Sequence, residues 1–303
     1  MKVRTYHELE GQASDLGDQV AWQNERVSQR LKSVRRVVAV MSGKGGVGKS
    51  LLTSSLATEL VRRGHRVGLL DADLNGPSVA PMVGASAAPL RFGADGILPP
   101  VTADGLAVMS MGLLVPDGAA VRWHEPAEAS FVWRGTQERG ALREFLADVA
   151  WGPLDFMLID LPPGTARLVE LHELVPELAG ALAVTIPSPA SRDAVARSLD
   201  LARAREIPVP GLVENLAGYR CEACGSVGRL SGGDAGESLS RDFDVPLLER
   251  IPFDPTLDAA AANGTLREWL AGSSRTGRQI GRVADRLEQS LGHPASPTAE
   301  ELR

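Results

Sequence analysis

Two lysines stand in one glycine-rich stretch of the chain, VVAVMSGKGGVGKS at residues 37–50. The part from Gly43 to Ser50 fits the pattern G-x-x-x-x-G-K-[ST], which forms a phosphate-binding loop between a strand and a helix. Glycines let backbone N–H groups turn inward onto phosphate oxygens, and the N-terminus of the following helix adds a positive end. This chemistry needs one lysine, Lys49, so the second lysine, Lys44, requires an explanation of its own.

The ligands that this loop predicts are a nucleotide and Mg²⁺. Lys49 would reach the β- and γ-phosphates, and the Ser50 hydroxyl would ligate Mg²⁺. A glycine-rich turn without a ligand is the alternative, and the strand pattern before the loop and the helix pattern after it disfavour that alternative. The residues expected to contact the nucleotide are Gly43, Gly45, Gly46, Val47, Gly48, Lys49, Ser50 and Leu51.

Carboxylates end two other apolar runs. MLIDLPPGT (157–165) ends a strand pattern at Asp160, which would hold a Mg²⁺-bound water, and the next turn would bring the Gly164 N–H near the γ-phosphate. In LLDADLNGPS (69–78), Asp71 and Asp73 point the same way because strand side chains alternate with a period of two. Acids that only cap turns are the alternative. Convergence of three such loops on one sheet edge, the usual ligand crevice of α/β sheets, favours a catalytic site.

Cys221 and Cys224 form a C-x-x-C pair, and Gly225 permits the tight turn that directs both sulfurs to one metal. With two cysteines in 303 residues a disulfide framework is excluded. A [4Fe–4S] cluster commonly needs four thiolates, and a closed zinc site also needs four ligands. The histidines nearest in sequence are His172 and His293. A symmetric dimer that joins two pairs at its two-fold axis would complete either site; a redox dithiol without metal stays open.

The elements that position these residues alternate along the chain. Apolar runs without alternation are typical of strands buried on both faces, and they occur at 36–41, 66–73, 154–161, 180–186, 209–215 and 245–251. Helical patterns lie between them, at 49–63, 136–149, 190–206 and 234–242. The alternation predicts an α/β fold with a doubly wound, mostly parallel sheet and helices on both faces, as in P-loop NTPases.

Three further segments complete the expected organisation. Residues 1–34 are predicted as a polar helical lead-in, 35–291 as one ATPase domain that contains the cysteine pair, and 292–303 as a disordered tail. Residues 96–112 break the rhythm and predict a hairpin at the sheet edge. The last helical pattern, which is expected to dock on the body, has one apolar face: Ile280, Val283, Leu287 and Leu291.

Composition argues against nucleic acid and membrane as partners. The net charge is −6, and no block of about five basic residues occurs. No apolar run approaches the roughly 18–20 residues that span a bilayer. The first residues lack the apolar core of a secretory signal, so the expected location is the cytoplasm, where thiols stay reduced.

Taken together, these motifs resemble the Mrp/ApbC family of iron–sulfur cluster carrier ATPases, within the deviant Walker A (SIMIBI) class of P-loop proteins. The resemblance runs from about Arg35 to Gly292. It rests on SGKGGVGKS, DADLNGPSVAPMVG, MSMGLL, FVWRG, IDLPPGT, GLVENLAGYRCEACG and IPFDP, in that order. It implies an ATPase that bridges a [4Fe–4S] cluster across a homodimer, with a cluster assembly scaffold and apo iron–sulfur proteins as partners.

The resemblance also implies roles for single residues. Lys44 would reach across the dimer to the partner's phosphates, like an arginine finger supplied in trans; a solvated loop lysine is the alternative. Asp73 would orient the attacking water, and Asp71 would support its loop. The residues that would contact the adenine are Asn215, Pro252 and Asp254.

The chain departs from the family pattern beside two motifs. Ala166 and Arg167 follow DLPPGT where Gly-Asp is common, and Thr136-Gln137 follow WRG where Pro-Met is common. Arg167 would slow hydrolysis if it held Asp71 or Asp73 away from the attacking water. An Arg167 that points to solvent would change nothing.

Two other functions share the P-loop class. One is a partition or positioning ATPase, with zinc bridging the dimer, but the chain lacks the basic patch or membrane-targeting terminal helix expected for it. The other is a nitrogenase-reductase-like electron donor, whose cysteines usually lie far apart in sequence.

Overall fold

The structure is a computed structural model that describes residues 16–85, 91–114, 131–221, 223–230 and 232–292. Within these ranges, parallel pairings join seven strands into one sheet in the order β11-β8-β7-β1-β6-β2-β5. The strands are β1 (Val37–Ser42), β2 (Val67–Asp71), β5 (Ala107–Met109), β6 (Phe156–Asp160), β7 (Gly180–Thr185), β8 (Leu212–Glu214) and β11 (Leu247–Arg250). Every strand predicted from an apolar run is present, and the predicted α/β fold class is confirmed.

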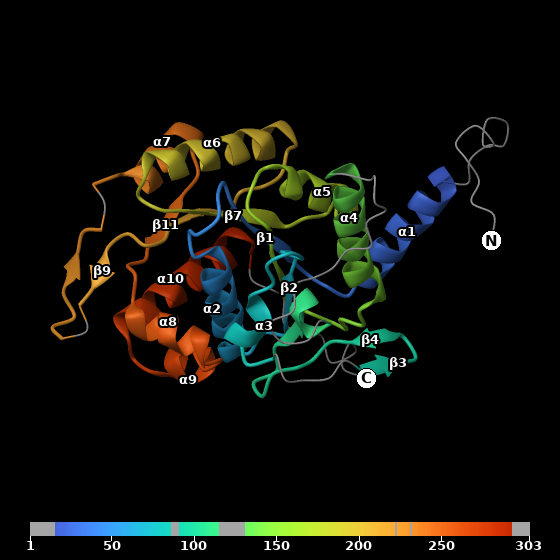
Figure 1. Cartoon of the computed structure of the whole chain (residues 1–303), viewed down its shortest axis with the longest axis horizontal. Coiled ribbons are helices and arrows are strands. Elements are labelled where there is room, and N and C mark those ends of the chain that lie inside the picture. Colours follow the sequence, from blue (N-terminus) through green and yellow to red (C-terminus); the bar gives the residue numbers. More distant parts are fainter. Residues whose placement is uncertain (1–15, 86–90, 115–130, 222, 231, 293–303) are drawn as a thin grey trace.

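Helices cover both faces of this sheet (Figure 1). One face carries α1 (Leu16–Leu31), α4 (Phe131–Asp148), α5 (Ala166–Leu174), α6 (Pro189–Ala204) and α7 (Ala235–Phe243). The other carries α2 (Lys49–Arg62), α3 (Val79–Met82), α8 (Pro255–Ala262), α9 (Leu266–Ala271) and α10 (Arg275–Ser290). The four predicted helices correspond to α2, α4, α6 and α7.

The unbroken apolar character of β1 follows from this layering. Val38 and Val40 face the core beneath α2 and α10, whereas Ala39 and Met41 face the core beneath α5 and α6. Since each face of the strand is buried, no position calls for a polar residue, and the sequence shows no alternation.

The last helix, α10, docks on the body as predicted. Ile280, Val283 and Leu287 are buried against α2, and Leu291 packs partly buried at its end. At the other end of the described chain, Val27 and Leu31 of α1 are buried against α4. Residues 1–15 of the predicted lead-in and residues 293–303 of the predicted tail lie outside the described residues, so those boundaries stay predictions.

The hairpin predicted over 96–112 is only partly correct. An antiparallel hairpin exists, but it lies earlier, with β3 (Arg91–Gly93) paired to β4 (Gly96–Leu98). The later half forms edge strand β5 of the main sheet, parallel to β2, and leads into a 3₁₀ turn (Met111–Leu113). Residues of β5 are buried on both faces, and that burial favours pairing with the sheet over a solvent-exposed hairpin arm.

A second hairpin, β9 (Tyr219–Arg220) with β10 (Val227–Gly228), projects from the body and carries the cysteine pair (Figure 1). Among the residues that the structure describes, no helix has the length and apolar character needed to cross a bilayer.

Candidate functional site

A cavity of about 470 Å³ opens at the carboxyl ends of the central strands, a size that suits a nucleotide. P-loop residues 44–51 form one wall, and residues 252–254 with Asn215 form another. Asp73 and Pro163 also line the cavity. The fold therefore brings together most of the residues that the sequence assigned to the nucleotide, and the lining residues come from five separate segments of the chain.

The P-loop has the backbone conformation that its glycines permit. Gly46 and Gly48 both have φ of 75°, in the left-handed region that favours glycine. A Cβ on Gly48 would also lie 2.3 Å from Nδ2 of Asn215, and this amide donates a hydrogen bond of 2.9 Å to the Val47 carbonyl. Gly43 packs against α6, where a Cβ would lie 2.2 Å from the carbonyl carbon of Ala194. Asn215 thus supports the loop while it lines the cavity.

Asp160, at the end of β6, accepts from three donors in the first five residues of α2. Its carboxylate is buried, and Lys49 Nζ lies 2.8 Å from Oδ1. The Ser50 hydroxyl donates to Oδ2 over 2.6 Å, and the Thr53 hydroxyl donates to Oδ1 over 2.8 Å. A lysine and a hydroxyl that line the cavity, with a buried carboxylate bonded to both, fit Mg²⁺ and phosphate chemistry. Sequence reasoning missed Thr53, although it lies one helical turn after Lys49.

Asp71 organises the next loop. It lies beside Asp160 in the β2–β6 register, and its carboxylate accepts from the backbone N–H groups of Asp73, Ser78 and Val79. The Ser110 hydroxyl, which sequence reasoning missed, donates to Oδ2 over 3.0 Å. Burial, and then the charge of Asp160, raises the pKa of Asp71 to about 6. Asp71 therefore shapes the loop and makes no contact with the cavity.

Of the two other residues predicted near the γ-phosphate, Asp73 faces the cavity and the Gly164 N–H does not. Asp73 lines the cavity, and its Oδ1 accepts from the Gly76 N–H over 3.1 Å. Gly164 has φ of 112°, and its N–H donates to the Ser42 carbonyl over 3.1 Å. The expectation that this N–H points to a γ-phosphate is not met in this conformation, because the tight Pro-Pro-Gly turn folds it back onto β1.

Lys44, the extra lysine, lies at the rim of the cavity and is half-buried. Its Nζ is 3.5 Å from the hydroxyl of Ser188, the residue that caps α6. The Ser42 hydroxyl donates to the Lys44 carbonyl over 3.0 Å, which holds the backbone of this lysine near the cavity.

The loop predicted to face the adenine is held by a buried carboxylate. Asp254 caps α8 through the Thr256 N–H and hydroxyl, and the Thr276 hydroxyl donates to it over 2.6 Å. Arg220 adds an ion pair of 3.3 Å. Pro252 and Asp254 both border the cavity, and the Asp254 carboxylate is already engaged by hydrogen bonds within the protein. Contact of these residues with adenine stays a prediction.

The cysteine pair lies at the tip of the β9–β10 hairpin. Both thiols are free; Cys224 is exposed and Cys221 is half-buried. The turn is closed by hydrogen bonds from the Cys221 N–H to the Ser226 carbonyl and from the Gly225 N–H to the Cys221 carbonyl. Hydrogen bonds from Ser226, and then from Cys221, lower the pKa of the Cys224 thiol. Accessible thiols of this kind are suited to binding a soft metal. In the described part of the chain, no three His, Cys, Asp or Glu side chains cluster with metal-binding geometry.

The hairpin is joined directly to the nucleotide cavity. The Phe253 N–H donates to the Gly218 carbonyl over 2.7 Å, and the Arg220 N–H donates to the Phe253 carbonyl over 2.9 Å. The rings of Tyr219 and Phe253 stack with centroids 6.2 Å apart. One backbone ladder therefore connects a cavity wall with the residue just before Cys221.

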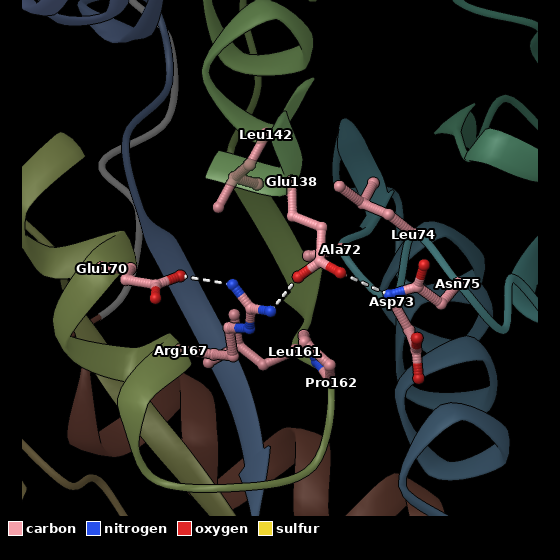
Figure 2. A pocket seen from close by; sticks show the side chains of 10 residues that line it. All are labelled: Ala72, Asp73, Leu74, Asn75, Glu138, Leu142, Leu161, Pro162, Arg167 and Glu170. Atoms are coloured by element: carbon pink, nitrogen blue, oxygen red, sulfur yellow. Dashed lines mark hydrogen bonds and ion pairs between the residues drawn. The ribbon is translucent and has the colours of Figure 1, made fainter. Parts of the chain in front are cut away.

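Arg167 contradicts both sequence expectations for it. Its guanidinium neither contacts the carboxylates of Asp71 and Asp73 nor points to solvent. Instead, it forms ion pairs with Glu138 and Glu170 in the described structure (Figure 2). Sequence reasoning missed Glu138, because nothing in the chain marks a residue on α4 as the partner of one on α5.

The fold and the P-loop are those of the P-loop NTPase class, with a second lysine in the phosphate loop. A sequence model described as ParA, NUBPL iron-transfer P-loop NTPase, matches residues 33–288. The chain belongs to this family, as the resemblance found in its motifs predicted.

Relatives with established names agree with this assignment. The iron–sulfur cluster carrier protein of Methanocaldococcus jannaschii is 37% identical over 246 residues, which cover 81% of this chain and 82% of the relative. The cytosolic Fe–S cluster assembly factor CFD1 of Chaetomium globosum is 40% identical over 266 residues, covering 82% and 84%.

Solved structures show the same fold. A nucleotide-binding protein of Archaeoglobus fulgidus, solved with ADP and containing cobalt, has 33% identity and a TM-score of 0.69 over 81% of this chain and 93% of its own. The cell division ATPase MinD of Pyrococcus furiosus has 20% identity and a TM-score of 0.58, covering 84% and 99%. At that identity, the similarity to MinD extends to the fold alone.

The raised pKa of Asp71 predicts a pH effect on stability. Its folded pKa of about 6 exceeds the ordinary value of 3.8, so the contribution of Asp71 to stability is fully present below about pH 4 and is lost as the pH rises through 6. Replacement by Asn removes this titration. The free energy of unfolding of the wild type, measured relative to D71N, should fall by on the order of 2–3 kcal/mol between pH 4 and 7.

Urea unfolding of nucleotide-free and Mg²⁺-free protein at several pH values measures this difference. D73N, which removes a less buried carboxylate of the same loop, is the control. Parallel pH profiles for wild type and D71N would contradict the assignment.

Proposed function

We propose that this protein is an ATP-hydrolysing iron–sulfur cluster carrier of the cytoplasm. Two copies would assemble a bridging [4Fe–4S] cluster and transfer it to apo iron–sulfur proteins, with a cluster assembly scaffold as the source. The observation that carries the proposal is the ladder between the cavity wall at Phe253 and the hairpin before Cys221, which joins a nucleotide site to a thiol site. The names of the relatives, cluster carrier and cluster assembly factor, support it.

The number of thiols supports a bridging cluster. Each chain has two cysteines, and a [4Fe–4S] cluster commonly needs four thiolates. Two hairpins facing each other across a two-fold axis would supply four. An exposed Cys224 on a projecting hairpin suits a cargo that must be released, whereas a structural metal is usually enclosed.

The residues in and beside the cavity support the proposal that ATP is hydrolysed. Lys49 would neutralise the β- and γ-phosphates, and Ser50 with Asp160 would hold Mg²⁺, which neutralises charge developing during transfer. Asp73, which also lines the cavity, would orient the attacking water. Lys44 of the partner chain would contact the phosphates in trans. Dimer formation would have to move its Nζ away from the Ser188 hydroxyl of the same chain.

Lys49→Ala is expected to weaken ATP binding by about tenfold or more, because it removes the cation that faces the clustered phosphate charge. Calorimetric titration with ATP and Mg²⁺ measures the change. K32A, which removes an exposed lysine beyond the cavity, is the matched control. Wild-type affinity in folded K49A protein would refute the assignment of the phosphate site.

Lys44→Ala should reduce turnover more than ATP binding, because its target lies on the other subunit. Mixed dimers of K44A and D73A chains discriminate between a trans and a cis lysine. If Lys44 acts in trans, one of the two sites has both groups intact, and about half of the activity returns. If it acts in cis, both sites stay damaged, and mixed dimers as inactive as the two parents would disprove the trans role.

Cys221→Ala and Cys224→Ala should each abolish the cluster and leave ATP affinity near that of the wild type. Anaerobic reconstitution with iron and sulfide should give wild-type protein about four irons per dimer and an absorbance band at about 400 nm. Metal binding should also shift the monomer–dimer equilibrium toward the dimer, because only the dimer presents both pairs.

The same experiment distinguishes an iron–sulfur cluster from the alternative, a zinc site. Stoichiometric zinc without iron after anaerobic purification would overturn the carrier proposal and indicate a zinc-bridged dimeric ATPase. Iron bound equally well by C221A or C224A would show that the cluster lies elsewhere.

A further inference from the structure

Arg167 occupies an unfavourable position for a cation. It is the second residue of α5, where the N-terminal end of the helix dipole is positive. It is also partly buried, with 27% of its side chain exposed, and a charge in such a place is stabilised by anionic partners. Two carboxylates supply them, Glu170 one turn later at 2.7 Å and Glu138 on the neighbouring helix α4.

Glu138 extends this ion pair to a third element. Its buried carboxylate accepts a hydrogen bond of 2.7 Å from Nδ2 of Asn75, in the loop that follows β2. Figure 2 shows the three side chains in a row, from Arg167 on α5 through Glu138 on α4 to Asn75 on the loop. We call Arg167, Glu138 and Asn75 the clasp.

The clasp holds the loop close to Asp73. Asn75 is two residues after Asp73, and Figure 2 shows the Asp73 carboxylate directed away from Glu138. That carboxylate lines the nucleotide cavity, whereas none of the clasp residues does. The loop is therefore held on one side by the clasp and presents its acid on the other.

The space beside the clasp is too small for a ligand. It encloses about 30 Å³, room for about one water molecule. A role in binding a substrate is therefore excluded for this pocket, and a role in positioning the loop is left.

Two parts of the same loop, its far end and its middle, are held by different means. The backbone N–H groups of Ser78 and Val79 bind Asp71, which holds the far end of the loop to the sheet. The clasp holds the middle of the loop, at Asn75, to α4 and α5. These two helices lie on the face of the sheet opposite to α3, the helix that follows the loop. Without the clasp, the segment around Asp73 would keep the anchor at Asp71 and the buried Leu74 side chain, but it would lose its hydrogen-bonded tie to α4 and α5.

We propose that the clasp positions Asp73 for hydrolysis of ATP and so sets turnover without setting nucleotide affinity. This inference rests on the proposed ATPase function. Arg167, Glu138 and Asn75 are positioning residues, since they act through the loop and lie outside the cavity. The arginine at 167 is then accommodated by Glu138, a partner of opposite charge across the helix interface.

Glu138→Ala and Arg167→Ala are expected to lower kcat about tenfold, because a loosened loop misplaces the acid relative to the attacking water. The KM for ATP and the affinity for ATP should change less than about twofold, since no cavity contact is lost. E138Q keeps an oxygen that can accept from Asn75 but loses the ion pair, so its kcat should lie between those of E138A and wild type.

Arg139→Ala is the matched control. Arg139 is the next residue on α4 and forms a 2.7 Å ion pair with Glu173 of α5, so it joins the same two helices without touching the Asp73 loop. R139A should keep wild-type kcat. The exchanged pair E138R/R167E should recover part of the turnover lost in the single variants, because an Asn75 amide can rotate its oxygen toward arginine.

Hydrogen exchange in the nucleotide-free protein gives a second, independent readout. The N–H groups of residues 73–76 should exchange faster in E138A and R167A than in wild type and R139A. If wild type lacks ATPase activity but these N–H groups still lose protection, the proposed function fails and the clasp stands. Wild-type or raised kcat in folded E138A and R167A, or unchanged exchange, would overturn the clasp.

Discussion

The site depends on one constraint, the need to neutralise the buried carboxylate of Asp160. Asp160 lies at the end of β6 with no access to solvent, and a buried charge is costly unless it is paired and hydrogen-bonded. Lys49, Ser50 and Thr53 meet that demand. All three belong to the first five residues of α2, so satisfying one carboxylate also fixes the start of this helix, and with it the P-loop, against the sheet.

The adjacent acid shows the cost of this arrangement. The parallel register of β2 and β6 places Asp71 beside Asp160, and two carboxylates in one dry environment cannot both ionise easily. The pKa of Asp71 rises to about 6, and three backbone N–H groups with the Ser110 hydroxyl stabilise its ionised form. The loop that presents Asp73 is thus organised around a charge that the strand register forces into the interior.

Every element of the site meets at one edge of the sheet, but the connections differ in kind. The P-loop is tied through side chains to Asp160, whereas the cysteine hairpin and the residues just before it are tied through backbone hydrogen bonds to Ile251 and Phe253. Arg220 strengthens that second tie with an ion pair to Asp254 directly before the first cysteine. A change in the cavity wall would therefore have a short physical path to the thiols, while the P-loop stays fixed to the core.

Local patterns in the sequence determined the strands, the principal helices and the residues of the phosphate loop. Strands buried on both faces require unbroken apolar runs, and a left-handed turn over phosphate requires glycine, so each leaves a mark within a few residues. The C-x-x-C pair is readable for the same reason. The mistaken hairpin at 96–112 contains a short apolar segment whose pairing with β2 depends on a strand distant in sequence.

Only the tertiary structure decided which charged groups meet. Arg167 and Glu138 are separated along the chain by β6 and lie on different helices, and no spacing rule links them. Thr53 and Ser110 are ordinary polar residues until folding places a buried carboxylate against each. The Gly164 N–H donates to the Ser42 carbonyl, a partner from a distant segment that the local sequence does not indicate. A motif records the chemistry of a single segment, whereas partners from distant segments are selected by the packing that brings them together.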